Sequence, residues 1–312
     1  MSQLGLHQLV APEDAKHDIV FVHGLFGNRI NTWTADKGPL WPQTLLGQDI
    51  PGARIFTFGY DADVTKLNLN EELTEGTMES HAADLCQRLS GFRAVTGSSD
   101  RPLIFVAHSL GGLICAQLVV KGALAGETDD IAIISKNTRG MIFLGTPFHG
   151  SPIAPFAKVF SSMVSVLHKT HTQKVKDLEQ KSEKLRILAE SFASALNQRI
   201  RENQEIRVAF FHETKKYLGV LVVPELNSRI PGFGDHASIN ANHSEMCKFS
   251  DPEDPGYQSV VAAIRKMAAD LDGKGPDASP QAHSVHYANT YLGNIKNQVN
   301  GNQTIHGGMH FA

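Results

Sequence analysis

Short apolar runs that alternate with longer amphipathic stretches restrict the fold of this chain more than any other feature. Each run is rich in β-branched and aromatic residues and is bounded by glycine, proline or polar residues, a pattern that predicts buried strands. The runs are Asp18-Ile-Val-Phe-Val-His-Gly, Ala53-Arg-Ile-Phe-Thr-Phe-Gly-Tyr, Leu103-Ile-Phe-Val-Ala, Gly140-Met-Ile-Phe-Leu-Gly, Ile206-Arg-Val-Ala-Phe-Phe and Val220-Leu-Val-Val. We expect the last of these to be the final strand.

Helical spacing of apolar residues fills the stretches between the runs. Residues 77–89 and the region from Tyr257 onward place apolar side chains three and four positions apart, and residues 110–124 are apolar almost all round. The second half of a long insertion, residues 151–203, carries Leu185, Leu188, Phe192, Leu196 and Ile200 on one helical face. Strands alternating with helices predict an α/β fold in which a mostly parallel sheet has helices on both faces and chemistry at its carboxyl end.

Composition limits which partners and which cellular compartment we expect for this chain. The 312 residues carry a formal charge of -3 with no dominant basic run, so nucleic acid and anionic membranes are not expected as partners. No run of apolar residues approaches the length of about 18 that a transmembrane span requires. Residues 1–16 lack the basic-then-apolar layout of a signal peptide, so we do not expect one. The three cysteines are widely spaced and odd in number, which favours reduced thiols and a cytoplasmic location.

The composition changes sharply near residue 272. We expect residues 1–272 to form the globular domain, with residues 151–203 as a candidate helical lid. Residues 273–284 are rich in Gly, Pro, Ser and Asp and predict a linker. Residues 285–312 are rich in Asn, Gln and Gly and contain an approximate eight-residue repeat. This composition predicts a second functional unit.

The sequence Ala107-His-Ser-Leu-Gly follows a predicted strand and opens a predicted helix. In that setting a serine flanked by small residues two positions away on each side indicates a nucleophile on a sharp, strained turn. Ser109 is therefore the candidate nucleophile. Ala107 stands where glycine is more usual, which adds one methyl group to the crowded turn.

A serine hydroxyl needs a base and an acid that orients the base. His243 lies after the last predicted strand and before the final helix, so it is the candidate base, with His236 as its competitor. The acid should follow the penultimate strand, where Glu213 leads. Glu225 and Asp235 stay open as alternatives.

Two backbone N–H groups should receive the negative charge that grows on the substrate oxygen. Leu110, directly after the nucleophile, supplies one, and Leu25 in the turn after the first strand supplies the other. We expect His23 to support that turn, and His108 and His149 to be turn or pocket residues. The sequence contains no metal-ligand pattern and no phosphate-binding glycine loop, so no metal and no cofactor is expected.

Four motifs in this order resemble a known group of serine hydrolases: His23-Gly, Ala107-His-Ser-Leu-Gly-Gly, Gly145-Thr-Pro-Phe-His-Gly-Ser and Asn242-His-Ser-Glu-Met-Cys-Lys-Phe. Over about residues 5–272 the chain resembles the α/β-hydrolase domain of fungal SesB-like proteins, which occurs free or attached to NACHT-type receptors. It also resembles the serine-active-site and inositol-deacylase lipase families. The resemblance implies a lipase-like or esterase-like enzyme whose substrate is an acyl ester, including lipid.

The tail is similar to the amyloid signalling motifs of fungal cell-death proteins, some of them like the animal RHIM, with Asn-Gly-Asn-Gln at residues 300–303. The resemblance implies self-assembly through residues 285–312, a NACHT-type receptor with a matching motif as partner, and recruitment to a membrane on activation. Asn and Gln ladders and the apolar residues Ile295, Val299 and Ile305 suit stacked chains. Two alternatives stay open: a hydrolase fold that has lost catalysis and acts as a scaffold, and a thioesterase or peptidase with the same machinery.

Overall fold

A mostly parallel sheet forms the centre of the molecule. The computed structural model describes residues 3–62, 75–148 and 175–271, and within them seven strands are arranged in the order β1-β3-β2-β4-β5-β6-β7. The strands are β1 (Gly5–Val10), β2 (His17–Val22), β3 (Ala53–Gly59), β4 (Leu103–His108), β5 (Thr138–Leu144), β6 (Arg207–Glu213) and β7 (Asp235–Ile239). Among these, β1 pairs antiparallel with β3 and every other pairing is parallel. The predicted α/β fold is therefore confirmed.

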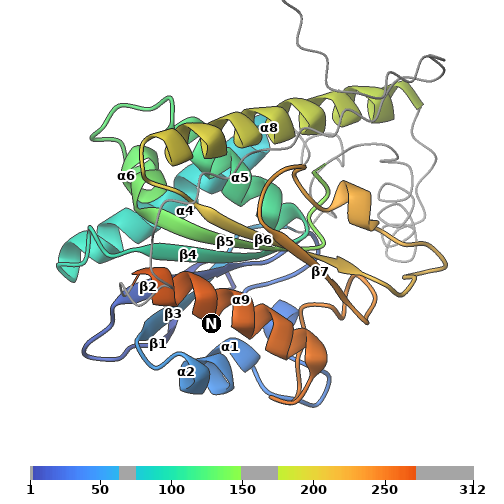
Figure 1. The fold of residues 1–312 in the computed structure, drawn as a ribbon, viewed down its shortest axis with the longest axis horizontal. Helices are drawn as coiled ribbons and strands as arrows, with labels where there is room; N and C mark the ends of the chain where they lie inside the picture. The colour runs from blue at the N-terminus through green and yellow to red at the C-terminus, as the bar shows by residue number, and fades with distance from the viewer. Residues whose placement is uncertain (1–2, 63–74, 149–174, 272–312) are drawn as a thin grey trace, which may run out of the picture. The chain divides into compact units, whose positions relative to one another are not determined.

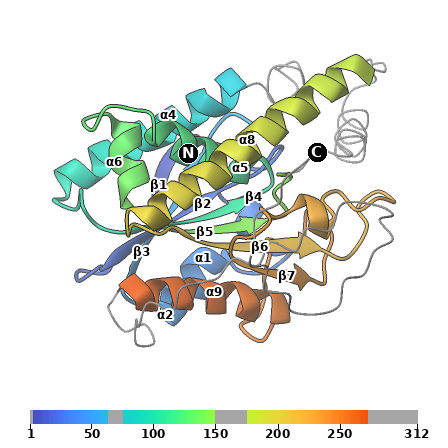
Figure 2. The same ribbon diagram turned by 45° about the horizontal axis from the view of Figure 1, so that its top comes forward.

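Helices cover both faces of this sheet, as Figures 1 and 2 show. On one face lie α4 (Glu75–Val95), α5 (Leu110–Gly122), α6 (Asp130–Asn137) and α8 (Val175–Arg201). On the other face lie α1 (Trp41–Thr44), α2 (Leu46–Asp49) and α9 (Pro255–Leu271). Two short 3-10 turns, η1 (Asn31–Trp33) and η2 (Glu225–Asn227), lie in the loops. Each face of the sheet consequently has its own apolar core.

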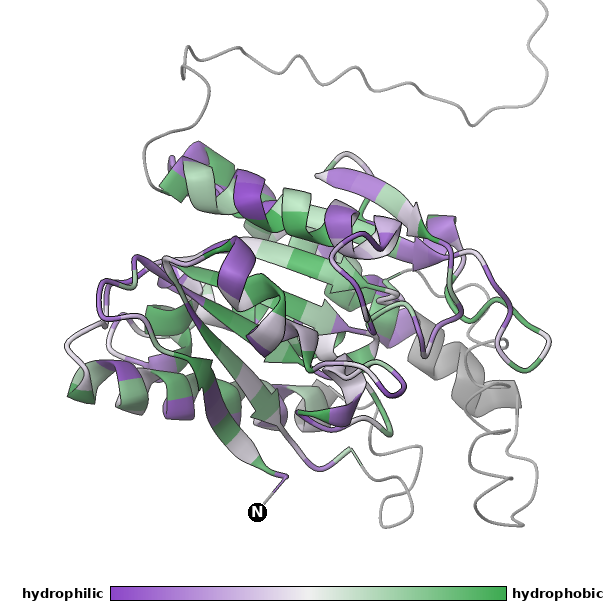
Figure 3. Cartoon of the chain, turned by 90° about the horizontal axis from the view of Figure 1, so that it is seen from below, coloured by the Kyte–Doolittle hydropathy of each residue, from purple (hydrophilic) through white to green (hydrophobic). Residues whose placement is uncertain are grey.

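The continuous apolar runs follow from this arrangement. Every residue of β2, β3 and β4 is buried, because a parallel sheet with helices on both faces leaves no strand position in contact with water. Figure 3 shows apolar residues concentrated in the strands, whereas the helices carry polar and apolar residues in turn. The hydropathy of each element therefore reports how many of its sides are covered.

The second half of the long insertion belongs to the core of the domain. Of the five apolar residues predicted on one helical face, four are buried in α8 and Ile200 is 46% exposed near its end. Phe192 packs against Phe143 of β5 and Phe148, with ring centroids 5.8 Å away in both cases. The described part of α8 is thus a covering helix. Residues 151–174 lie outside the described residues, and the lid remains a prediction for them.

One predicted strand is wrong, and β1, β7 and α6 are among the elements that were not predicted. Val220-Leu-Val-Val lies in a loop, where Val222 and Val223 are buried in the same apolar core as residues of α8. The final strand is instead β7, an edge strand whose residues are largely exposed and whose sequence contains no apolar run. Edge strand β1 and helix α6 also lacked a clear sequence signal.

Some sequence expectations fall beyond the described residues. The linker at residues 273–284 and the Asn/Gln-rich unit at residues 285–312 are outside them, and both stay predictions. In the part of the chain that the structure describes, no helix combines the length and the apolar character required to cross a membrane.

A buried charge cluster holds the amino ends of the central strands. Asp18 of β2 is fully buried and forms a bidentate pair with Arg54 of β3, with both N···O distances 2.8 Å. Arg93 donates to the same carboxylate at 3.0 Å. Burial lowers the pKa of Arg93 to about 10, an effect that Asp18 opposes, so this guanidinium stays charged at neutral pH.

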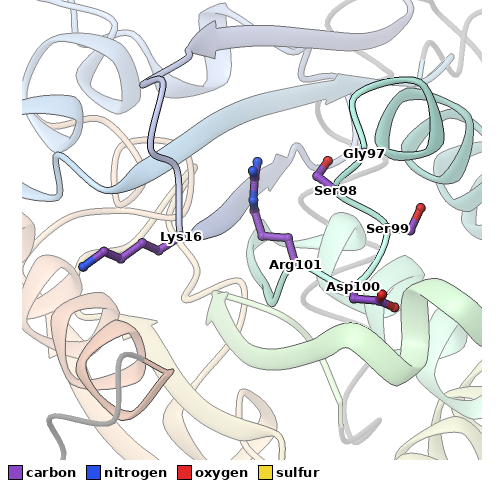
Figure 4. Close-up of a pocket in the computed structure, with 6 residues that line it drawn as sticks. All are labelled: Lys16, Gly97, Ser98, Ser99, Asp100 and Arg101. Carbon is purple, nitrogen blue, oxygen red and sulfur yellow. The ribbon is translucent and has the colours of Figure 1, made fainter.

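Beside this cluster lies an open cavity of about 470 Å³, lined by Lys16, Gly97, Ser98, Ser99, Asp100 and Arg101. Figure 4 shows that the side chains of Lys16 and Asp100 point in different directions, so the lining residues do not converge on one point.

We expect Phe192→Ala to lower the free energy of unfolding by about 3 to 5 kcal/mol, because it leaves a cavity beside the rings of Phe143 and Phe148. Ile200→Ala is the matched control on the same helix and should cost less than about 1 kcal/mol, since nearly half of that side chain is exposed. Urea unfolding followed by circular dichroism measures both. Equal losses in the two variants would contradict the packing of α8 described here.

Candidate active site

Ser109 occupies a strained turn between β4 and α5. Its backbone has φ 51° and ψ -120°, a conformation that serine rarely adopts. The Ser109 N–H donates to Leu144 O at 2.9 Å, which ties the turn to β5. At Gly111 an added Cβ would lie 2.4 Å from Val22 O, so only glycine fits there. The sequence around the serine is thus set by backbone crowding.

The turn after β2 lies directly against this serine. An added Cβ on Gly24 would stand 2.8 Å from Ser109 Cβ and 2.9 Å from His108 Nδ1. Glycine at position 24 therefore allows the backbone of that turn to approach the serine closely. This places Leu25, the next residue, at the same end of the sheet.

His243 and Glu213 form a buried pair at the carboxyl end of the sheet. His243 Nδ1–H donates to Glu213 Oε2 at 3.4 Å, and the two side chains are 7% and 0% exposed. The other oxygen of Glu213 accepts the Val223 N–H at 2.6 Å. Because Nδ1 faces the carboxylate, the second ring nitrogen, Nε2, is the one left to accept a proton.

Gly145 makes room for this imidazole. Its φ is +57°, and an added Cβ would stand 3.0 Å from both Nδ1 and Cε1 of His243. Its N–H donates to Phe211 O at 2.8 Å, so the turn after β5 is fixed to β6. The first residue of the Gly-Thr-Pro-Phe motif, Gly145, is therefore required to be glycine by its positive φ and by the nearby imidazole.

His108 connects the nucleophile turn to the histidine loop. Its Nε2–H donates to the backbone oxygen of His243 at 2.9 Å, and the two rings lie 4.9 Å apart between centroids. Burial, with a smaller contribution from His243, lowers the pKa of His108 to about 3, so the ring is neutral. Among the described residues, no hydrogen bond joins the Ser109 hydroxyl to the His243 ring. The turn of Ser109 is instead connected to His243 by the hydrogen bond that His108, its neighbour in the chain, donates to the His243 carbonyl.

The competing residues lie elsewhere on the surface. The carboxylate of Glu225 is 47% exposed and lies 3.6 Å from both Arg229 and His236. Asp235 is 77% exposed and pairs with Lys266 at 2.8 Å. His236 is a residue of β7 rather than of the loop that follows it. Of the three candidate acids, the structure brings Glu213 to His243.

Two backbone N–H groups are available near Ser109. Leu110 is the first residue of α5, where N–H groups have no acceptor within the helix. Neither a backbone nor a side-chain acceptor within the described residues receives the Leu25 N–H. Phe26, which follows, has φ 57° and donates to Ala62 O at 3.2 Å. The oxyanion donors expected at Leu25 and Leu110 therefore have no backbone acceptor within the described residues.

The remaining site expectations concern His149 and metal ions. His149 lies outside the described residues. Over residues 3–62, 75–148 and 175–271, no three His, Cys, Asp or Glu side chains gather closely enough to hold a metal ion.

Comparison with known proteins finds a family that matches most of this chain. A family model described as "Putative serine esterase (DUF676)" matches residues 12–205. Human SERAC1 is 26% identical over 278 residues, covering 82% of this chain and 40% of that protein. Zebrafish (Danio rerio) SERAC1 is 30% identical over 257 residues, covering 75% and 36%. The chain thus spans about two fifths of the length of these relatives.

The solved structures are more distant. An esterase of Thermogutta terrifontis, Est2 with butyrate bound, has a TM-score of 0.45 and 14% identity, covering 87% of this chain and 90% of that one. Acylaminoacyl peptidase of Pyrococcus horikoshii has a TM-score of 0.48 and 12% identity, covering 84% and 41%.

The buried histidines predict a loss of stability in acid. Burial lowers the pKa of His23 to about 4 and that of His108 to about 3, whereas an unfolded histidine has a pKa of 6.5. Below pH 6.5 the unfolded chain therefore binds protons that the folded chain does not. The free energy of unfolding should fall as the pH decreases from about 6.5 towards 4, with a slope of up to about 1.4 kcal/mol per pH unit for each group.

Urea unfolding of the wild type and of His108→Gln across this pH range measures the effect. Glutamine can still donate to the His243 carbonyl but does not titrate, so the variant should show a shallower dependence on pH. Identical slopes in the two proteins would show that His108 is not held neutral.

Proposed function

This chain belongs to the DUF676 serine esterase family, and from that premise we propose that it hydrolyses carboxylic esters, lipid or other acyl esters, through Ser109. The observation that carries the proposal is the buried Glu213–His243 pair at the end of the sheet where Ser109 occupies its strained turn. The parallel sheet positions these groups along one edge, with Ser109 after β4, Glu213 at the end of β6 and His243 after β7.

In the proposed mechanism, the Ser109 oxygen attacks the ester carbonyl carbon while His243 Nε2 takes the hydroxyl proton. Glu213 keeps the imidazole in the tautomer with hydrogen on Nδ1 and stabilises the imidazolium that forms. The Leu25 and Leu110 N–H groups bind the oxyanion. His243 then gives its proton to the leaving alcohol, and water releases the acyl group by the same steps. Hydrogen bonds between nucleophile and base are often long before substrate binds.

Two exposed leucines in the loop that binds the acid support an acyl or lipid substrate. Val223, which binds Glu213, belongs to the loop between β6 and β7. The same loop exposes Leu218 and Leu226, at 58% and 71%. We extend the proposal to residues 151–174 as a cover over the acyl group and to the cytoplasm as compartment, where free, buried cysteines such as Cys86 and Cys115 are usual.

The proposal predicts a distinct response to four substitutions. The full chain should hydrolyse p-nitrophenyl butyrate or longer acyl esters, and Ser109→Ala should abolish that activity. Glu213→Gln should lower kcat roughly 10³-fold to 10⁴-fold, because the imidazole loses its orienting carboxylate. Glu225→Gln and Asp235→Asn are matched controls that should stay within about twofold of the wild type.

Activity that survives Ser109→Ala would reject the nucleophile. A large loss in Glu225→Gln or Asp235→Asn, with Glu213→Gln unaffected, would reject the acid.

The finer part of the proposal concerns the tail. We propose that residues 285–312 assemble in a templated manner and so switch on the hydrolase as a cell-death effector, with a NACHT-type receptor as template. The support is the composition of this segment and its resemblance to amyloid signalling motifs. The relatives reported above are SERAC1 proteins of vertebrates rather than SesB-like proteins or NACHT-type receptors.

A peptide of residues 284–312 should form fibrils with a cross-β reflection near ~4.7 Å. Ile305→Pro should prevent assembly, because proline cannot donate to the strand ladder. X-ray fibre diffraction and thioflavin fluorescence measure both peptides. A wild-type peptide that stays monomeric at high concentration would contradict the templating role.

A further inference from the structure

Tyr60 contacts His23, the residue at the start of the turn that carries Leu25. His23 is fully buried, and its ring stacks on the Tyr60 ring with centroids 4.3 Å apart and planes inclined by 3°. The Tyr60 hydroxyl donates to His23 O at 2.8 Å, and the Tyr60 N–H donates to His23 Nε2 at 3.3 Å. Tyr60 therefore fixes both the ring and the carbonyl of the residue at the start of the turn.

The other ring nitrogen of His23 fixes the next carbonyl. Because Nε2 accepts a hydrogen bond, the neutral ring carries its proton on Nδ1, and Nδ1–H donates to Gly24 O at 2.8 Å. Gly24 O also accepts the Gly27 N–H at 3.1 Å. Burial keeps His23 neutral down to a pKa of about 4, so this tautomer persists across the neutral range.

These bonds determine where the Leu25 N–H points. In a trans peptide unit the carbonyl and the following N–H point in opposite directions. Gly24 O is held on the side of His23 and Gly27, so the Leu25 N–H is directed to the other side. Gly24 itself lies against Ser109, and the Leu25 N–H has no acceptor within the described residues.

We propose that Tyr60 is a positioning residue of the reaction: its hydroxyl, through His23, sets the orientation of the Gly24–Leu25 peptide and so of the oxyanion donor. The proposal rests on the function proposed above. Position 60 requires the hydroxyl and not merely an aromatic ring, because phenylalanine would keep the stack on His23 but release the His23 carbonyl. An oxyanion donor that is free to rotate stabilises the transition state less well, whereas substrate binding changes little.

The test compares Tyr60→Phe with Tyr257→Phe in the full chain. Tyr257 is the matched control, because its buried ring also loses one hydroxyl bond, to Asp49 Oδ2 at 2.5 Å, on the opposite face of the sheet. For each protein we measure kcat and KM with p-nitrophenyl butyrate, the rate of phosphonylation by a fluorophosphonate, and the thermal midpoint. In phosphonylation the Ser109 oxygen bonds to phosphorus, fluoride leaves, and the serine proton passes to His243.

Tyr60→Phe should lower kcat and the phosphonylation rate together by roughly 10-fold to 100-fold, with KM within about twofold, because both reactions place charge on an oxygen bound by Leu25. Tyr257→Phe should react at the wild-type rate, even if its midpoint falls as far. Normal rates in Tyr60→Phe, a change in KM alone, or an equal loss in Tyr257→Phe would overturn the assignment. A wild type that neither turns over ester nor labels at Ser109 would instead reject the proposed function and this inference with it.

Discussion

The left-handed backbone of Ser109 is the constraint on which the rest of the site depends. Holding a serine at φ 51° costs on the order of 1 to 3 kcal/mol, and the surrounding structure must supply that energy. Three neighbouring strands do so: Leu144 of β5 accepts the serine N–H, the end of β2 closes over Gly111, and β4 holds Ala107 in the core. A serine on a sharp turn is consequently possible only where the sheet is already rigid.

The sheet gains this rigidity from the end opposite the site. Asp18 and Arg54 pair across β2 and β3, and Arg93 from α4 joins the same carboxylate. A buried ion pair contributes little net stability by itself, but it fixes one register, because a slip would leave charges buried without partners. The Asp18 cluster lies at the amino ends, whereas the polar groups of the site, Glu213 and His243 among them, lie at the carboxyl ends. The two ends of the sheet thus have different tasks.

Strands could be predicted from the sequence where the chain is buried on both faces of the sheet. The runs that became β2, β3, β4 and β5 could be predicted because full burial demands apolar residues at every position. Edge strand β7 could not, since Asp235-His-Ala-Ser-Ile has one side in water and reads as a loop, whereas the apolar Val220-Leu-Val-Val packs as a loop and reads as a strand. The choice among Glu213, Glu225 and Asp235 depended on how that loop folds, which local pattern does not encode.

Tyr60 shows why part of a site is visible only in three dimensions. In the sequence it closes an apolar run, and nothing separates it from a core residue. Parallel pairing of β2 with β3 sets Val22 beside Phe58, so the residues just past the ends of these strands, His23 and Tyr60, lie side by side. The parallel pairings of β4 with β5 and of β5 with β6 likewise bring Ser109, after β4, and Glu213, at the end of β6, to the same edge of the sheet. The register of the sheet therefore determines which residues can act on one substrate.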